Sequence, residues 1–495
     1  MPESALLSPD IQKRNQFLLF GLSFVFIISN SIFLFLGYYI YSLLPIALFL
    51  VFLAFVSLKK ILFVIVFFVP LSVQLKEFFP DLGLNLYLPS EPLLVLVLFL
   101  FLARLFMEKN FPKNIFLHPV SLAIFFYLMW LIITTLTSSM PLVSFKFVLT
   151  RIWFIVGFYF LPLIVFSNQK NFTRYISLYG IAMVIVVSYT LVNHIQDGLI
   201  NQKAAHGAPD PFFNDHTSYG AILAMLIPVF IGLASRLTTK TTIRILLWLT
   251  VVLFLVALTF SYSRAAWISV IAALGVFLLI KFRIKFSLVA MLGVLAVLSV
   301  SFYWGDIMMK LEQNRQDSAN NFSKHIESMS NISSDASNLE RINRWASAIR
   351  MFKERPFLGW GPGTYMFQYA GFQSSREKTI ISTNFGDRGN SHSEYIGPLS
   401  ESGILGSLSI VLVLSLTFYT GFRYYNKNRE TPTSWMVLAA SLGLLTYAVH
   451  GFLNNFLDTD KASALFWGYM ALIVSFDLYK KESGSKEEEN RSVKA

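Results

Sequence analysis

The stretch Asn390-Ser391-His392-Ser393-Glu394-Tyr395 lies near the end of a long polar segment, residues 305–402, which separates two blocks of apolar sequence. The chain has 495 residues, of which 55% are hydrophobic and only 14% are charged. Ordinary soluble domains carry about 25% charged residues, so the composition indicates a polytopic membrane protein. The polar segment is the region where chemistry is expected, and the apolar blocks are its scaffold.

Apolar runs on both sides of this segment are long enough to cross a bilayer. A span needs about 20 apolar residues, and the sequence predicts about fourteen spans. They are predicted at residues 16–36, 38–57, 61–76, 88–106, 119–138, 148–167, 175–193, 217–235, 244–261, 265–280, 286–304, 403–422, 433–452 and 462–479. The predicted fold is an all-α polytopic membrane protein with one large periplasmic loop that contains short amphipathic helices.

Four regions follow from these spans. Residues 1–304 are predicted to form an N-terminal transmembrane bundle, and residues 403–480 a smaller C-terminal group of helices. Residues 305–402 form the large loop between the two groups. Residues 481–495 are rich in charge and are expected to be a disordered cytoplasmic tail.

Lys and Arg residues mark every second junction between spans. Examples are Lys13/Arg14, Lys59/Lys60, Lys170/Arg174 and Lys480/Lys481. Positive residues in short junctions stay on the cytoplasmic side, so both termini are predicted to be cytoplasmic and the large loop to face outward. The net charge of +12 is explained by this orientation signal, and nucleic acid is not an expected partner.

The large loop contains a predicted helix and a tight turn. Its first part, residues 320–338, is rich in Ser and Asn and is expected to be mobile. Ser337-Asn338-Leu339-Glu340 has the pattern of a capping box, and apolar residues follow at helical spacing. Pro356 is expected to end this amphipathic helix, and a tight turn is predicted at Gly359, Gly361 and Gly363.

Three motifs lie in or near the outer junctions of the later spans. The first is Ser261-Tyr262-Ser263-Arg264-Ala265-Ala266-Trp267, at the junction of two spans. The second is Arg344-Trp345 with Ala348, followed by Pro356 and the three glycines. The third is His392-Ser393-Glu394-Tyr395 followed by Glu401-Ser402-Gly403-Ile404-Leu405-Gly406. In this order the motifs resemble the O-antigen ligase and polymerase superfamily of bacterial envelope glycan enzymes, with Ser393 in place of the family's usual Asn, and the resemblance covers about residues 219–425.

This resemblance implies a glycosyltransferase of the bacterial inner membrane with a periplasmic active site. The donor would be a glycan linked to undecaprenyl diphosphate. The acceptor would be a hydroxyl of lipid A-core, of another lipid-linked glycan or of a protein, so ligase and polymerase activities both remain open. The family's chemistry is metal-independent, and no cofactor is expected.

His392 is the candidate general base, because imidazole has its pKa near neutral pH. The alternative is a solvated loop histidine. Arg264 is a candidate for binding the diphosphate, because a guanidinium pairs with two phosphate oxygens; the alternative is an arginine that fixes helix depth. Arg341 and Arg344 are candidates for guiding the anionic donor, and for Arg341 a solvated helix face is the favoured alternative.

Two glutamates and a further arginine complete the candidates near this site. Glu394 and Glu401 both lie close to His392 in the sequence, and either could orient the imidazole; a structural role before Gly403 is the alternative for Glu401. Arg151 lies at the membrane edge, where an ionisable residue is often functional. The alternative for Arg151 is pairing with a carboxylate of an outer loop.

The loop at residues 194–216 departs from the family pattern. The resemblance implies a second essential Arg in or near this region, but no Arg occurs between Arg174 and Arg236. Lys203 and His216 are candidates to replace it, with a solvated polar loop as the alternative. Asp458-Thr459-Asp460 has the D-x-D form of a metal-binding motif, but three residues are a weak signal and no metal site is predicted there.

A membrane transporter is the competing function. Transporters carry ionisable residues near the bilayer midplane, whereas the charges of this chain lie near the ends of the predicted spans. The sequence therefore favours the enzyme.

The charge pattern makes a testable prediction about orientation. A cysteine at Ser330 should react with a membrane-impermeant maleimide in cells whose outer membrane has been permeabilised, and a cysteine at Ser485 should not. The native chain contains no cysteine, so the background is clean. Labelling at Ser485 without labelling at Ser330 would overturn the topology.

Overall fold

The computed structural model is almost entirely helical, as the sequence predicts. It describes residues 9–78, 86–109, 111–237, 240–284, 325–375, 377, 378, 382 and 389–492. In these residues, eleven helices are long and apolar enough to cross a membrane. The described strands are β1 (Val73–Gln74) and β2 (Tyr87–Leu88), which pair antiparallel.

The chain forms two compact units, residues 1–61 and 62–495, where the sequence predicts one N-terminal bundle over residues 1–304. The first unit contains α1 (Pro9–Phe35), the 3-10 helix η1 (Tyr39–Leu43) and α2 (Leu44–Val56), and α3 (Leu58–Phe68) crosses the boundary. The long helices of the second unit are α4 (Ser90–Met107), α5 (Pro119–Leu136), α6 (Pro141–Ile155), α8 (Lys170–Gln196), α10 (His216–Gly232), α11 (Thr241–Phe260), α12 (Arg264–Lys281), α15 (His325–Glu354), α17 (Ile396–Lys427), α18 (Pro432–His450) and α19 (Asp460–Ser492). Its shorter helices are η2 (Leu75–Glu77), η4 (Lys113–Phe116), η5 (Val156–Phe160), α7 (Leu161–Val165), α9 (Ala204–Gly207), η6 (Leu233–Leu237), α16 (Tyr365–Gln368) and η7 (Tyr369–Phe372).

The predicted count of fourteen spans is not confirmed. Helix α3, predicted as a span over residues 61–76, has 11 residues. That length gives about 16 Å, against about 30 Å of hydrocarbon. The predicted span at 38–57 corresponds to an apolar helix, Tyr41–Val56, that is shorter than a span, and the predicted span at 286–304 lies outside the described residues.

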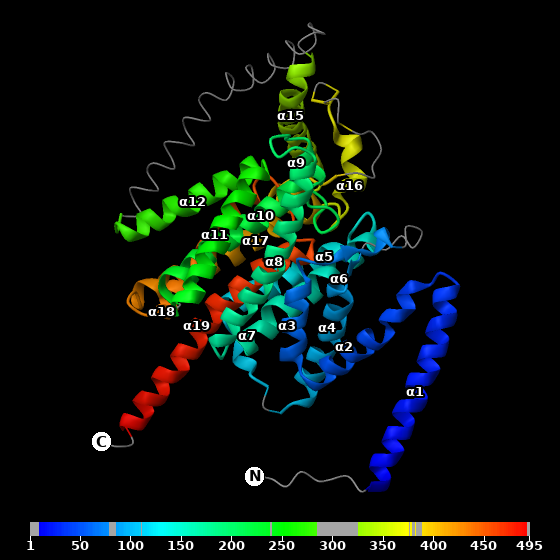
Figure 1. The fold of residues 1–495 in the computed structure, drawn as a ribbon. Coiled ribbons are helices and arrows are strands. Elements are labelled where there is room, and N and C mark those ends of the chain that lie inside the picture. Colours follow the sequence, from blue (N-terminus) through cyan, green and yellow to red (C-terminus); the bar gives the residue numbers. More distant parts are fainter. Residues whose placement is uncertain are drawn as a thin grey trace. The chain divides into compact units, whose positions relative to one another are not determined.

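Helix α10 is the centre of packing in the second unit. It packs against α11, α12 and α18, and its residues are buried almost without exception from Tyr219 to Phe230. A helix that is apolar on all sides is stable only when other helices surround it. Figure 1 shows α10, α11 and α12 in green, with α15 beyond one end of them.

The junctions that the charge pattern assigns to the outer face meet at one end of the second unit. An added Cβ on Gly220, in the first turn of α10, would lie 2.8 Å from Ser263, just before α12. Tyr395, just before α17, donates through its hydroxyl to the carbonyl of Ala448 near the end of α18 (2.7 Å). The amide of Ser139, after α5, donates to the carbonyl of Trp360 in the large loop (2.9 Å). We call this end of the helices the site end.

Helix α15 begins earlier than the sequence predicts. It starts at His325, so residues 337–340 lie inside the helix and the predicted capping box is wrong. A capping pattern marks a helix start only where the preceding residues stop the helix, and residues 325–337 contain neither Gly nor Pro. Residues 325–338, expected to be mobile, are thus helical, and residues 320–324 lie outside the described residues. Helix α15 ends at Glu354, just before Pro356, as predicted.

The predicted glycine turn is confirmed, and it contacts a kink in α17. Gly403 has φ +68° and interrupts the helical backbone there. The amide of Gly361 donates to the carbonyl of Glu401 (2.7 Å). Gly359 has φ +66°, and an added Cβ would lie 2.3 Å from the carbonyl carbon of Glu401. The turn therefore needs glycine both for its backbone conformation and for the close approach of α17.

The ends of two C-terminal helices differ from the predicted boundaries. Helix α17 begins at Ile396, inside the predicted loop at 305–402. Helix α19 continues to Ser492, where the sequence predicts a disordered tail from residue 481. Lys and Glu are good helix formers, so a charged tail can continue a helix that begins in the bundle.

The turn yields a stability prediction. Gly359→Ala should lower the free energy of unfolding by about 2 kcal/mol or more. Alanine is strained at the positive φ of this position, and its Cβ would overlap the backbone of Glu401. The control is Gly371→Ala, since an added Cβ on Gly371 meets nothing within 4 Å. Thermal unfolding in detergent measures both variants, and equal melting temperatures would contradict the role given to the turn.

Candidate functional site

His392 and Arg344 lie in contact at the site end. Arg344 belongs to α15, and His392 precedes α17. Nη1 of Arg344 is 3.3 Å from Nε2 of His392. A guanidinium has donors only, so we assign Nε2 as the acceptor and the ring proton to Nδ1. The two strongest candidates from the large loop thus form one unit.

Arg344 is held in place by several partners. Its Nε donates to Glu340 Oε1 (2.9 Å), and its Nη1 donates to the carbonyl of Asn390 (3.1 Å). The guanidinium carbon lies 5.6 Å from the ring centroid of Tyr369. An added Cβ on Gly389, which has φ +91°, would lie 1.9 Å from Nη1. Arg344 is only 8% exposed, so it is a fixed cation.

The surroundings of His392 keep its imidazole neutral. Burial lowers the pKa of His392 from 6.5 to about 3, and the positive charges of Arg344 and Arg341 act in the same direction. The carboxylates of Asp215 and Glu340 act in the opposite direction with smaller effect. At neutral pH the ring therefore carries no charge, which is the form that accepts a proton.

Arg341 and the start of α10 form the neighbouring part of the site. Asp215 caps α10, because its Oδ1 accepts from the amides of Thr217 (2.6 Å) and Ser218 (2.8 Å). Burial lowers the pKa of Arg341, and the nearby charge of Asp215 acts against that effect. The ring of His216 stacks on His206, with centroids 4.1 Å apart. Arg341, expected on a solvated helix face, is half-buried and supplies a cation next to the loop that lacks arginine.

Arg264 is an exposed cation at the site end. It is the first residue of α12, and its side chain forms no hydrogen bond or ion pair with the described residues. Ser263 is the N-cap residue, but its side chain makes no capping hydrogen bond, and its buried Oγ has no partner within the described chain. An uncapped helix N-terminus attracts anions, so Arg264 and this N-terminus favour the same kind of ligand.

Arg151 and Glu394 belong to a buried network. Glu394 Oε1 accepts from the Tyr447 hydroxyl (2.6 Å) and from the amides of Phe456 (2.8 Å) and Leu457 (3.0 Å). Arg151 donates to the carbonyl of Leu457. The two residues are 6% and 7% exposed. They therefore hold the loop between α18 and α19. The hydrogen bond of Arg151 goes to a backbone carbonyl rather than to an outer-loop carboxylate, so its functional role and the alternative both stay predictions.

Glu401 and Lys203 contact other parts of the molecule. A side-chain oxygen of Glu401 accepts from the amide of Tyr365 (3.0 Å), next to the glycine turn. The side chain of Lys203 is exposed and forms no bond with the described residues. Neither residue makes a described contact with His392, so their proposed roles stay predictions.

The D-x-D sequence is used for packing. Asp460 Oδ2 accepts from Ser72 (2.7 Å) and from Ser90, and Asp460 Oδ1 is 3.4 Å from Lys461 Nζ. Within the described ranges, no group of three or more His, Asp or Glu side chains is placed to hold a metal ion.

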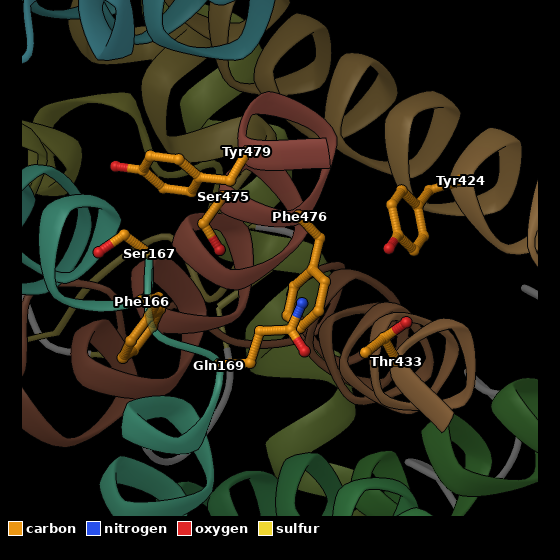
Figure 2. Close-up of a pocket in the computed structure, with 8 residues that line it drawn as sticks. All are labelled: Phe166, Ser167, Gln169, Tyr424, Thr433, Ser475, Phe476 and Tyr479. Carbon is orange, nitrogen blue, oxygen red and sulfur yellow. The ribbon is translucent and has the colours of Figure 1, made fainter. Parts of the chain in front are cut away.

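Two cavities with polar side chains in their walls lie at opposite ends of the second unit's helices. One, of about 300 Å³, lies between the later parts of α17 and α19 and the start of α18, and Figure 2 shows its lining by Tyr424, Thr433 and Ser475, among others. It contains none of the candidate residues. The other, of about 170 Å³, lies at the site end and is lined in part by Asp215 and Asn390.

Two partners of Arg344 were not predicted from the sequence. Glu340 lies four residues before Arg344 on the same helix, and this spacing is a signal that could have found the ion pair. Asn390 holds Arg344 through its backbone carbonyl. No side-chain pattern encodes such a contact, so only the folded chain reveals it.

Residues 249–411 match the family model described as O-Antigen ligase. A search of the curated proteins finds no match. The matched residues are about a third of the chain and include Arg264, Arg344, His392, Glu394 and Glu401. The resemblance to the O-antigen ligase and polymerase superfamily is thereby confirmed for this part of the chain, and the match supports a membrane enzyme of that type.

Proposed function

We propose that this membrane enzyme transfers a glycan from undecaprenyl diphosphate to an acceptor hydroxyl, as an O-antigen ligase does. The observation that carries the proposal is the neutral imidazole of His392 held against Arg344, at the same end of the helices as the exposed Arg264. The reaction needs a base for the acceptor and fixed cations for the departing diphosphate. A polymerase of the same superfamily needs the same groups and differs in its acceptor.

The donor diphosphate is assigned to Arg264 and the N-terminus of α12. Arg264 is unpaired within the described chain, so binding an anion breaks no ion pair. Negative charge on the diphosphate grows as its bond to the sugar breaks, and these groups stabilise that charge.

His392 is assigned to the acceptor. The acceptor oxygen forms a bond to the anomeric carbon of the donor sugar while the bond from that carbon to the diphosphate oxygen breaks. The hydroxyl proton passes to the imidazole, and the lipid diphosphate leaves with the bond's electron pair. No metal and no cofactor has a part in this scheme.

Donor binding prepares His392 for this step. A base with a pKa of about 3 is too weak at neutral pH, since a general base works best when its pKa is near the operating pH. Burial is the largest cause of this low pKa, and the fields of Arg344 and Arg341 add to it. The negative charge of the diphosphate opposes those two fields, so donor binding moves the pKa of His392 upward.

The charge pattern of the sequence supports placing this reaction at the periplasmic face of the bacterial inner membrane. The acceptor is then a hydroxyl of lipid A-core, with a lipid-linked glycan or a protein as the alternatives.

The role of His392 is tested by substitution and by pH. His392→Ala should lower kcat for transfer by about 10²–10⁴-fold while donor binding persists, in a reconstituted assay with excess EDTA. In the wild type, kcat/KM for the donor should stay level from about pH 8 to pH 5, because it reports the free enzyme, whose His392 is neutral. The value of kcat should begin to fall at a higher pH than kcat/KM does, because it reports the donor complex, in which the pKa of His392 is raised.

The matched control is His118→Ala. His118 begins the helix α5 at the end away from the site, where it pairs with Asp477 at 3.5 Å, so its loss should leave transfer intact in folded protein. Near-wild-type transfer by His392→Ala would refute the mechanism. Loss of transfer in EDTA, restored by Mg²⁺, would show that a metal is required.

Arg264 is tested against its conservative variant. Arg264→Ala should raise the KM for the donor and lower kcat, because the charge that Arg264 meets exists in the ground state and grows in the transition state. Arg264→Lys should rescue only part of both, since an ammonium lacks the planar fork. If Arg264→Ala changes neither constant, the diphosphate binds elsewhere.

A further inference from the structure

The site-end cavity of about 170 Å³ has no role in the chemistry assigned above. It lies between the start of α10, the loop before α17 and the loop before α19. Its walls combine aromatic rings with amide and carboxylate side chains, which include Tyr87, Phe456, Asn214, Asn455 and Asp458. Concave sites with aromatic walls and a few polar groups are typical of small-ligand binding.

The polar groups of this cavity suit hydroxyls. Asn214, Asn390 and Asn455 each carry an amide that both donates and accepts hydrogen bonds, and the carboxylates of Asp215 and Asp458 accept them. A sugar hydroxyl also donates and accepts. The aromatic rings offer flat apolar faces to the C–H side of a pyranose.

The same cavity does not suit a diphosphate. Lys461 is part of its lining, but its Nζ lies 2.7 Å from Ser72 Oγ and 3.4 Å from Asp460 Oδ1. This cation is therefore already paired. The carboxylates of Asp215 and Asp458 repel an anion, so the phosphates belong with Arg264 and the cavity is left for a neutral group.

The size and position of the cavity fit a single sugar ring beside His392. A cavity of about 150 Å³ admits benzene, so 170 Å³ has room for one six-membered ring. Oδ1 of Asn455 is buried and has no hydrogen-bond partner in the described chain. Asn390 connects the cavity to the base, because its Oδ1 accepts from the amide of His392 (3.0 Å) and its carbonyl accepts from Arg344.

We propose that this cavity binds one sugar ring next to His392 and so selects the sugar at the point of transfer. The proposal rests on the proposed glycan transfer and names a binding site for it. The ring belongs either to the first sugar of the donor or to the terminal sugar of the acceptor, and kinetics separate the two sources.

The test removes one amide from the cavity. Asn455→Leu keeps the size of the side chain and removes its hydrogen bonds. It should raise the KM for one substrate about tenfold, a change that corresponds to about 1.4 kcal/mol, while kcat changes little. A rise in the donor KM assigns the ring to the donor, and a rise in the acceptor KM assigns it to the acceptor. The matched control is Gln169→Leu, an amide that lines the opposite cavity (Figure 2), and it should change neither constant.

A second variant covers the case in which Asn455→Leu does not fold. Asn214 is exposed and its Nδ2 donates to the Tyr87 hydroxyl (3.1 Å), so Asn214→Leu should fold and raise the same KM. If folded variants leave both KM values unchanged while transfer proceeds, the cavity holds only water and the inference is overturned.

A binding experiment distinguishes failure of the proposed function from failure of the sugar site. If the wild-type protein transfers no glycan, saturation-transfer NMR with free glucose, galactose and N-acetylglucosamine decides the cavity's role. If one of these sugars receives saturation from the wild-type protein but not from Asn455→Leu or Asn214→Leu, the sugar site is supported. Absence of saturation for all of them rejects it.

Discussion

The contact between the glycine turn and the kink of α17 is the interaction on which the site depends. The turn follows α15, which carries Arg344, and the kink at Gly403 lies eleven residues after His392. Because Gly361 and Glu401 are joined by a backbone hydrogen bond of 2.7 Å, the end of α15 and the start of α17 are held together. Two residues far apart in the sequence, Arg344 and His392, are brought to 3.3 Å by this geometry.

The cost of burying charge divides the arginines of the site end into two kinds. A buried charge is tolerated only when it is paired and hydrogen-bonded. Arg151 and Arg344 meet this condition through backbone carbonyls and, for Arg344, through Glu340. Arg264 is exposed and has no partner among the described residues, so it is free for an anionic ligand. Exposure and pairing, which the sequence does not reveal, thus separate structural arginines from the ligand candidate.

Opposite charges are also separated in space at the site end. Arg264 and the start of α12 form a cationic part, whereas the cavity beside Asn390 carries the carboxylates of Asp215 and Asp458. Asn390 lines this cavity and also bonds to His392 and Arg344, so the base lies beside the cavity. A lipid-linked sugar also has two parts, an anionic diphosphate that suits the cationic part and a neutral ring that suits the cavity.

Sequence alone determined the helical membrane fold, the helix that ends before Pro356 and the glycine turn, because apolar run length, proline and left-handed glycine act locally. It also singled out His392, Arg264 and Arg344 as candidates, and their roles stay predictions. Other features needed tertiary structure. The length of α3, the early start of α15 and the division at residue 61 depend on what each segment packs against. The positions of Glu394 in a buried network and Arg341 beside α10 depend on which distant segments meet, and that is decided by packing rather than by residue type or spacing.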